Sequence, residues 1–249
     1  MSSVQTVYGV HAVRALLDRH AERVVSLRIA STREDPRMRD IESLARERGI
    51  SLQRIDPREL KQKLGDVAHQ GVVAEVRPLP PWTEDDLIDA LTRVTSPLIL
   101  ALDGVQDPHN LGACLRTADA CGALAVVVPK DRAAQLTPAA RKVAAGAAET
   151  TPIVTVTNLV RTLKLLKEAN VWIVGADAEA DKLARDADLK GSIALVLGAE
   201  GAGLRQLTRQ TCDFLVRLPQ LGSVESLNVS VATGMLLYEA LRQRSDVTR

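Results

Sequence analysis

This sequence has few aromatic side chains and almost no net charge. The only aromatic residues are Tyr8, Trp82, Trp172, Phe214 and Tyr238, or 2% of 249 residues. This argues against modules that bind single strands by stacking bases on aromatic platforms. Lys and Arg number 32 against 31 Asp and Glu, a net charge of +1. If RNA is bound, its shape and its phosphates must therefore be recognised by a local surface.

Cysteines and long apolar segments are scarce as well. Cys114, Cys121 and Cys212 form neither a C-x-x-C pair nor an even set, which is typical of small hydrophobic residues in a reducing compartment. No run of 18 apolar residues occurs, and no basic start is followed by an apolar signal segment. We therefore predict a cytoplasmic protein with no membrane partner and no bound metal.

The first third of the chain has the pattern of a small α/β domain. Apolar spacing predicts helices at 9–19, 36–48 and 57–64 and strands at 24–30, 50–55 and 71–76. Three prolines then occur within residues 77–81, where they withhold backbone donors and disfavour a helix or a central strand. We predict a domain over residues 1–76 and a Pro-rich linker with a short helix over residues 77–97.

Residues 98–249 alternate between strands and helices. Strands are predicted at 98–102, 124–128, 153–156, 171–176, 193–197 and 214–218, and helices at 109–121, 138–147, 158–169, 203–211 and 226–243. The strands are continuous runs of Val, Ile, Leu and Ala, which are typical of a parallel sheet covered on both faces. The predicted fold class is α/β.

Three segments share one construction: an apolar strand, a loop bearing Gly or Asn, and then a helix. They are residues 103–122, 194–204 and 218–236. The third contains Ser226, Leu227 and Asn228, more hydrogen-bonding groups than a single helix cap needs. Ser226 as a cap and Asn228 as a surface residue of the first turn are the structural alternatives. Three such loops indicate one site assembled from three places.

The first loop offers Asn110 and Arg116. Asp107 and Pro108 suit the cap and first position of a helix, and Arg116 lies off the apolar stripe that follows. If both were helical, Asn110 and Arg116 would diverge by about 120°, so they can converge only if Asn110 lies in the loop. The planar fork of arginine suits phosphate or carboxylate, although an isolated arginine is more often simply solvated.

The second loop carries Gly198, Gly201 and Gly203. Glycine permits positive φ and a close approach of the backbone to a ligand. The order G-x-x-G-x-G is neither the dinucleotide fingerprint nor the P-loop. Glu200 either favours the start of the helix or faces the ligand, and since a carboxylate repels phosphates the loop suits a less anionic ligand.

The motifs NLGACLRTADACG, LVLGAEGAG and SVESLNVSVATG resemble the three motifs of the SpoU (TrmH-type) RNA ribose 2′-O-methyltransferases of the SPOUT superfamily. YGVHAVRALL and AHQGVVAEV are similar to the N-terminal domain of the bacterial 23S rRNA guanosine 2′-O-methyltransferases. The resemblance covers the whole chain. It implies an S-adenosyl-L-methionine-dependent enzyme that methylates a guanosine ribose in 23S rRNA, expected in the P-loop of the peptidyl-transferase centre.

The resemblance also implies an architecture and roles. The catalytic domain would carry a C-terminal trefoil knot, the small domain would resemble ribosomal protein L30e, and the protein would form a homodimer acting on 23S rRNA or on the assembling large subunit. Backbone contacts to the cofactor would come from Gly198, Leu218 and Leu227. The reaction centre would contain Asn110, Arg116, Glu200, Ser226 and Asn228.

Arginine is effectively always protonated and so is a poor base. Our hypothesis is therefore that Arg116 grips the phosphate beside the target ribose and stabilises the developing oxyanion. The proton would go to water or to Glu200. The alternatives are a tRNA ribose methyltransferase, a noncatalytic RNA-binding ribosome-assembly factor and, weakened by the glycine order, a nucleotide-dependent oxidoreductase.

Overall fold

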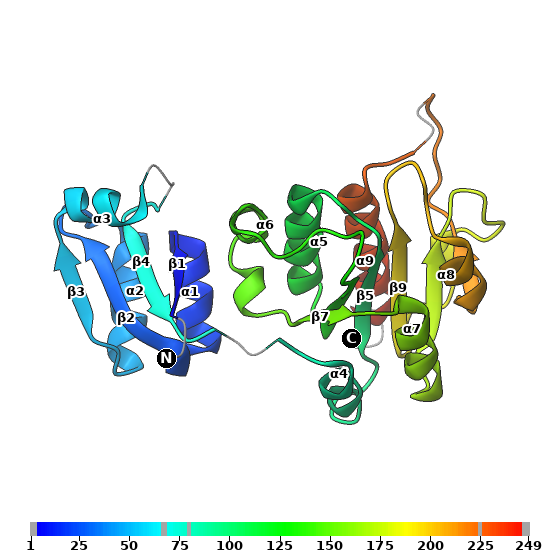
Figure 1. Ribbon diagram of the computed structural model, residues 1–249, viewed down its shortest axis with the longest axis horizontal. Helices are drawn as coiled ribbons and strands as arrows, with labels where there is room; N and C mark the ends of the chain where they lie inside the picture. The colour runs from blue at the N-terminus through cyan, green and yellow to red at the C-terminus, as the bar shows by residue number, and fades with distance from the viewer. Residues whose placement is uncertain (1–3, 66–68, 79–80, 224–225, 246–249) are drawn as a thin grey trace. The chain divides into compact units, whose positions relative to one another are not determined.

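The computed structural model describes residues 4–65, 69–78, 81–223 and 226–245 (Figure 1). The chain divides into two compact units: residues 1–80 together with Ala145–Thr150, and the remainder. Leu79 and Pro80 of the predicted linker lie outside the described residues. The helix expected within that linker, α4 (Glu84–Leu91), belongs to the second unit, where Leu87 is fully buried.

The first unit is a four-stranded sheet in the order β1-β4-β2-β3. Its strands are β1 (Gln5–Tyr8), β2 (Val24–Ala30), β3 (Leu52–Ile55) and β4 (Val72–Val76), and its helices are α1 (Val10–Arg19), η1 (Ala21–Arg23), α2 (Pro36–Glu47) and α3 (Pro57–Leu64). Neighbouring strand residues point to opposite faces. Accordingly Ile29 joins the core under α1 and α2, while Ala30 packs with Leu60 of α3. Strand β1, which the sequence pattern did not predict, pairs antiparallel with β4.

The short segment Ala145–Thr150, which includes η2 (Ala147–Glu149), is part of the first unit although it lies far along the chain. Arg23 donates from Nη2 to Glu149 Oε2 at 3.1 Å and from Nε to the Arg77 carbonyl at 2.9 Å. The Arg23 and Glu149 side chains are 8% and 4% exposed. A charge buried this deeply is tolerated because it is paired and hydrogen-bonded, so the segment is fixed to its neighbours electrostatically.

The second unit is a six-stranded sheet in the order β10-β8-β9-β5-β6-β7. The strands are β5 (Leu98–Asp103), β6 (Ala125–Pro129), β7 (Ile153–Val156), β8 (Trp172–Ala176), β9 (Ile193–Gly198) and β10 (Phe214–Val216). Every pairing is parallel, which confirms the predicted parallel sheet. All carboxyl ends of the strands therefore meet at one edge.

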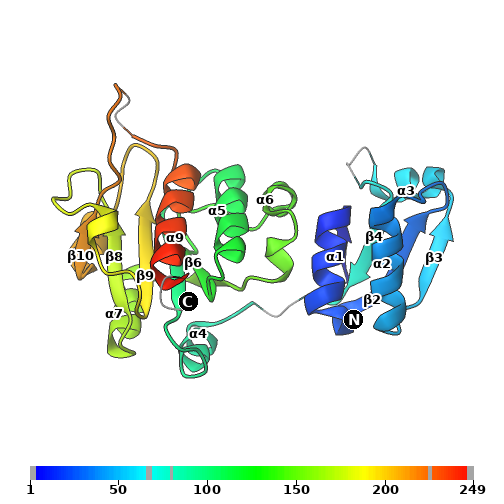
Figure 2. The same cartoon turned by 180° about the vertical axis from the view of Figure 1, so that it is seen from behind.

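Helices cover both faces of this sheet (Figures 1 and 2). Helices α5 (Pro108–Ala120), α6 (Pro138–Ala144) and α9 (Val229–Ser245) lie on one face, where α5 packs against both α6 and α9. Helices α4, α7 (Leu159–Glu168) and α8 (Gln206–Thr211) lie on the other, and η3 (Ala184–Asp186) contacts α9. The apolar strands are buried because both of their faces are covered.

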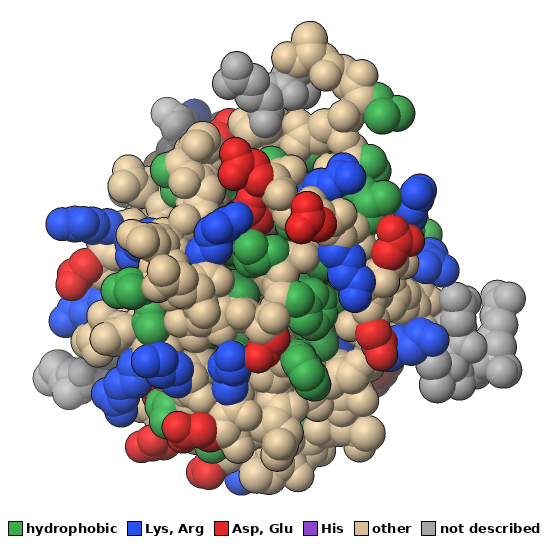
Figure 3. Space-filling view, turned by 90° about the vertical axis from the view of Figure 1, so that its right-hand side faces the viewer, with side chains coloured by type: hydrophobic (Ala, Val, Ile, Leu, Met, Phe, Trp, Pro, Cys, Tyr) green, Lys and Arg blue, Asp and Glu red, His purple; other side chains and the backbone are tan. Residues whose placement is uncertain are grey.

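The end of the second unit formed by β10 and β8 carries exposed hydrophobic side chains, including Trp172 and Leu207. Figure 3 shows hydrophobic side chains there, bordered by charged ones of both signs. Phe214 lies 6.4 Å from the Trp172 ring, and Lys182 stands 5.3 Å over the Phe214 ring, within cation–π range.

The cysteines are unpaired. Cys114 is fully buried, and burial raises the pKa of its thiol to about 11, while Cys121 and Cys212 are half-buried. Burial likewise raises the pKa of Cys212, to about 12. These thiols are protonated at neutral pH and pack as small hydrophobic residues. Among the described residues, no helix is long and apolar enough to cross a membrane.

Gly112 tests the close packing of α5 on α6. A Cβ at Gly112 would lie 2.4 Å from the Ala140 carbonyl oxygen, whereas one at Gly234, also inside a helix, would meet nothing nearer than 3.8 Å. We expect Gly112→Ala to lower the free energy of unfolding by about 1–3 kcal/mol through overpacking. Gly234→Ala should leave it unchanged or raise it by up to about 1 kcal/mol. Urea unfolding of both variants would measure this, and equal effects would contradict the packing argument.

Candidate active site

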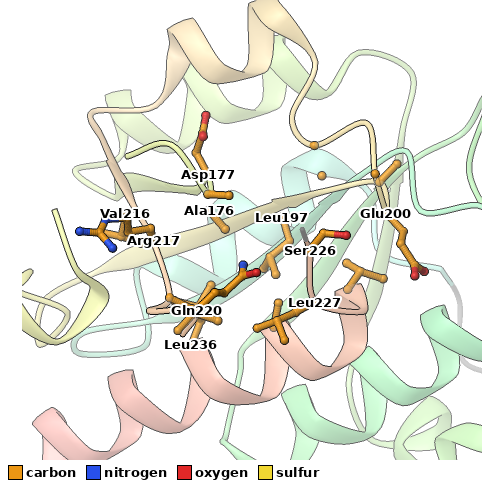
Figure 4. Close-up of a pocket in the computed structure, with 18 residues that line it drawn as sticks. Ala176, Asp177, Leu197, Glu200, Val216, Arg217, Gln220, Ser226, Leu227 and Leu236 are labelled. Carbon is orange, nitrogen blue, oxygen red and sulfur yellow. The ribbon is translucent and has the colours of Figure 1, made fainter. Parts of the chain in front are cut away.

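The three loops singled out in the sequence meet at the carboxyl edge of the parallel sheet, where the open crevices of α/β sheets lie. A pocket opens there beside β8, β9, β10 and the start of α9 (Figure 4). Five predicted site residues line it: Gly198, Glu200, Leu218, Ser226 and Leu227. These residues come from two loops separated along the chain by α8 and β10.

The glycine-bearing loop folds back on itself at the end of β9. A Cβ at Gly198 would lie 1.9 Å from the Gly203 carbonyl carbon, so no other residue fits there without moving the loop. Ala199 and Gly203 exchange two backbone hydrogen bonds, of 3.1 and 2.9 Å. Gly201 and Gly203 have positive φ, a conformation that glycine adopts without steric cost. The glycines therefore shape one tight wall of the pocket.

A buried carboxylate fixes the end of the same loop. Asp103, the last residue of β5, pairs in register with Gly198. Its Oδ2 accepts the Arg205 N–H at 2.9 Å, and its Oδ1 lies 3.5 Å from Arg205 Nη1. The prediction of a helix from residue 203 was wrong, because the backbone N–H of Arg205 is turned to Asp103 and α8 begins at Gln206. Sequence reasoning missed Asp103, and its only signal was an acidic residue ending an apolar strand.

Asn228 joins the three loops. Its Nδ2 donates to Asn110 Oδ1 at 3.1 Å and to Glu200 Oε2 at 3.3 Å. Its Oδ1 accepts from the N–H and the hydroxyl of Ser230 at 2.9 and 2.6 Å. The prediction that the last helix begins at residue 226 was wrong: α9 begins at Val229. The Asn228 side chain satisfies the Ser230 N–H in the first turn of that helix, and Ser226 is exposed at the pocket instead.

Asn110 and Arg116 differ in what they reach. Asn110 lies in the first turn of α5, not in the preceding loop, and still bonds Asn228 because α5 packs beside α9. Arg116 is exposed and does not line the pocket. As the helical geometry required, the two side chains do not converge. The structure thus brings Asn110, Glu200 and Asn228 together, and Arg116 lies apart from them.

Three polar residues line the pocket without having been predicted: Asp177, Arg217 and Gln220. Asp177 accepts the Arg209 Nε–H at 2.5 Å and the Glu179 N–H at 2.8 Å. Burial raises the pKa of Asp177, but these two donors outweigh it and the net pKa is lowered. The pocket therefore carries an ionised carboxylate. The position of Asp177 directly after a strand was a signal that could have found it.

Comparison with known proteins identifies the family of the chain. The SpoU rRNA methylase family matches residues 97–238, and the RNA 2′-O ribose methyltransferase substrate-binding family matches residues 6–82. The chain belongs to the SpoU rRNA methylase family. Two relatives are named 23S rRNA (guanosine-2′-O-)-methyltransferase RlmB. The one from Pseudomonas syringae pv. tomato is 55% identical over 98% of both chains, and the one from Escherichia coli K12 is 50% identical over 97% of this chain and 99% of its own.

Solved SpoU structures share the fold. The SpoU methyltransferase AviRb from Streptomyces viridochromogenes, in complex with AdoMet, matches 98% of this chain and 91% of its own with a TM-score of 0.77 and 26% identity. The A. aeolicus TrmH/SpoU tRNA modifying enzyme matches 66% of this chain and 86% of its own with a TM-score of 0.57 and 30% identity. The match to AviRb spans both units, and the match to the tRNA-modifying enzyme is confined to two thirds of the chain.

The role of Asn228 can be tested by a variant that keeps its hydrogen bond to the Ser230 N–H at the start of α9 but loses its bonds to Asn110 and Glu200. Asn228→Ser keeps a capping hydroxyl but cannot reach Asn110, while Asn228→Ala loses both and should cost about 1 kcal/mol more in the free energy of unfolding. In a double-mutant cycle with Asn110→Ala, Asn228→Ser should show a coupling of about 0.5–1.5 kcal/mol. Denaturant unfolding gives all values. Additive effects of Asn110→Ala and Asn228→Ser would mean that the bond between the loops contributes nothing.

Proposed function

We propose that the protein transfers a methyl group from S-adenosyl-L-methionine to the ribose 2′-oxygen of a guanosine in 23S rRNA. One observation carries this proposal: Asn228 holds Asn110 and Glu200 together at the edge of a pocket lined by Gly198, Leu218 and Leu227. The near full-length relatives that are named for this activity support it.

The pocket suits this cofactor by its chemistry. Its walls include the aliphatic Leu197, Leu227 and Leu236, and its carboxylates are Asp177 and Glu200. Carboxylates repel phosphates but are compatible with a cationic nucleoside. We assign the backbone of Gly198, Leu218 and Leu227 to holding S-adenosyl-L-methionine, which supplies an electrophilic methyl group on a sulfonium sulfur.

The reaction centre would act mainly by positioning. Holding a ribose hydroxyl in line with the methyl group can supply much of the acceleration. Asn228 directs the exposed Glu200 carboxylate, whose remaining lone pairs are available to accept the hydroxyl proton. Ser226, exposed at the pocket, can hydrogen-bond the ribose. These roles make Glu200 the proton acceptor and Asn110, through Asn228, its support.

Arg116 has a different task in this proposal. Its side chain is exposed and has no hydrogen-bond or ion-pair partner among the described residues. The guanidinium fork matches a phosphate bidentately. We propose that Arg116 grips the phosphate beside the target ribose and stabilises the developing oxyanion there, so its ligand is the RNA.

The family resemblance extends the proposal in other ways. We place the target guanosine in the P-loop of the peptidyl-transferase centre, on 23S rRNA or the assembling large subunit, in the cytoplasm. The small unit would be an L30e-like RNA-binding domain. By the same resemblance, we expect the catalytic domain to carry a C-terminal trefoil knot.

A homodimer is supported by an apolar stripe on α9. Val231, Met235 and Tyr238 recur at the spacing of one helix face, and their side chains are 50%, 43% and 64% exposed. Figure 2 shows α9 on the outside of its face of the sheet. Exposed apolar stripes of this kind mark protein interfaces, and we propose that a second copy of the chain covers this one.

The enzymatic proposal predicts methyl incorporation into a 23S rRNA fragment at a guanosine 2′-oxygen and none into tRNA when both are assayed in parallel. Arg116→Lys should lose about 100-fold in the methylation rate, because a single ammonium cannot replace the fork. Arg93→Ala, an exposed arginine at the opposite edge of the sheet, is the control. Near wild-type activity of Arg116→Lys would refute the phosphate fork. Methylation of tRNA alone would favour the other substrate.

The dimer proposal predicts that Met235→Glu produces monomers, because the interface would have to bury a charge without a partner. Leu207→Glu is the control, since Leu207 is also an exposed apolar residue, at 65%, and lies on α8, on the other face of the sheet from α9. Analytical ultracentrifugation of the three proteins would measure their masses. A dimeric Met235→Glu protein would show that the second copy binds elsewhere, and a monomeric wild type would exclude the dimer.

A further inference from the structure

Gln220 is a polar side chain in the pocket that has no role so far. It is half-buried and lines the pocket together with aliphatic residues. Among the residues that the structure describes, its amide makes no hydrogen bond. A half-buried amide without a partner loses hydrogen bonds to water without replacing them in the protein. Its placement is accounted for if a ligand supplies the missing partner.

The position of Gln220 indicates which part of the cofactor it would meet. Figure 4 shows Gln220 near Leu236, on the side of the pocket away from Glu200, with its amide directed toward Leu197. The reaction centre lies at the Glu200 side, where Asn228 joins the loops. The methyl-bearing sulfur must face that side. Of the two larger groups on the sulfur, the flat uncharged adenine base suits the far, aliphatic side better than the charged amino-acid group does.

We propose that the Gln220 side chain reads the adenine of S-adenosyl-L-methionine. Glutamine complements adenine because its carbonyl oxygen accepts from the 6-amino group while its amide N–H donates to a ring nitrogen. Backbone contacts hold the cofactor as a nucleoside, whereas this side chain distinguishes its base from other purines. Gln220 is thus a specificity-determining residue. The inference rests on the proposed function, because it takes the cofactor as given.

Binding of S-adenosyl-L-homocysteine, measured by calorimetry, tests this inference without RNA or turnover. Gln220→Leu should bind it about tenfold more weakly than the wild type, since two hydrogen bonds are lost. The analogue with a purine base, which lacks the 6-amino group, should bind the wild type about threefold more weakly, because one of the two hydrogen bonds is lost. Gln220→Leu should bind both ligands equally, because the group that distinguishes them is gone.

Two further variants sharpen the test. Gln220→Glu keeps an acceptor for the 6-amino group but loses the donor to the ring nitrogen, so it should weaken binding and still prefer the adenine ligand. Gln206→Leu, the same change at an exposed position on α8 outside the pocket, should bind both ligands as the wild type does.

The outcomes separate the inference from the proposed function. Wild-type affinity of Gln220→Leu for S-adenosyl-L-homocysteine would overturn the role of Gln220. So would an equal loss for both ligands, which would mean that Gln220 contacts another part of the cofactor. If the wild type itself bound neither ligand while remaining folded, the proposed cofactor would fail and with it the function. Binding and rRNA methylation by the wild type together with an unaffected Gln220→Leu would overturn the inference alone.

Discussion

The site depends on one side-chain amide. Asn228 donates to Asn110 in the first turn of α5 and to Glu200 of the second loop, and accepts from Ser230 in the first turn of α9. Only an amide can donate in two directions and accept at the same time from so short a side chain. Aspartate could cap the helix but would repel Glu200, and serine could cap it but would not reach across. The three segments are therefore held in one arrangement, because the Asn228 side chain forms a hydrogen bond to each of them.

The backbone around this amide is fixed by two features of the neighbouring strands. Gly198 lets the second loop fold back onto the end of β9, and Asp103 on β5, directly beside it, holds the Arg205 N–H that closes the loop. A buried carboxylate persists only where such donors are provided. Glu200 is thus presented by a loop that is fixed at both ends, which is what a residue needs if it is to accept a proton at a set place.

Much of the fold could be predicted from local pattern. Continuous apolar runs predicted five of the six strands of the large sheet to within one residue at each end, because burial on both faces leaves no polar position in them. Strand β1 was missed because of its four residues only Val7 is buried. Helix starts were wrong where tertiary bonds decide them: the Arg205 N–H binds Asp103, and Asn228 caps α9. The place of Ala145–Thr150 depends on the distant Arg23, and no local pattern encodes it.

The candidate site was predictable for a related reason. Its residues lie in loops, where polar groups beyond the needs of a helix cap stand out, and parallel strands bring such loops to one edge. This reasoning does not extend to Arg116, which lies on a helix and not in a loop. Their spacing along a helix predicted that Arg116 and Asn110 point apart. In the structure, Arg116 lies outside the pocket. We proposed RNA as the ligand of Arg116 because its side chain lies outside the pocket, is exposed and has no partner among the described residues. In the proposed function, the loop residues therefore hold the nucleoside and the helical arginine contacts the RNA.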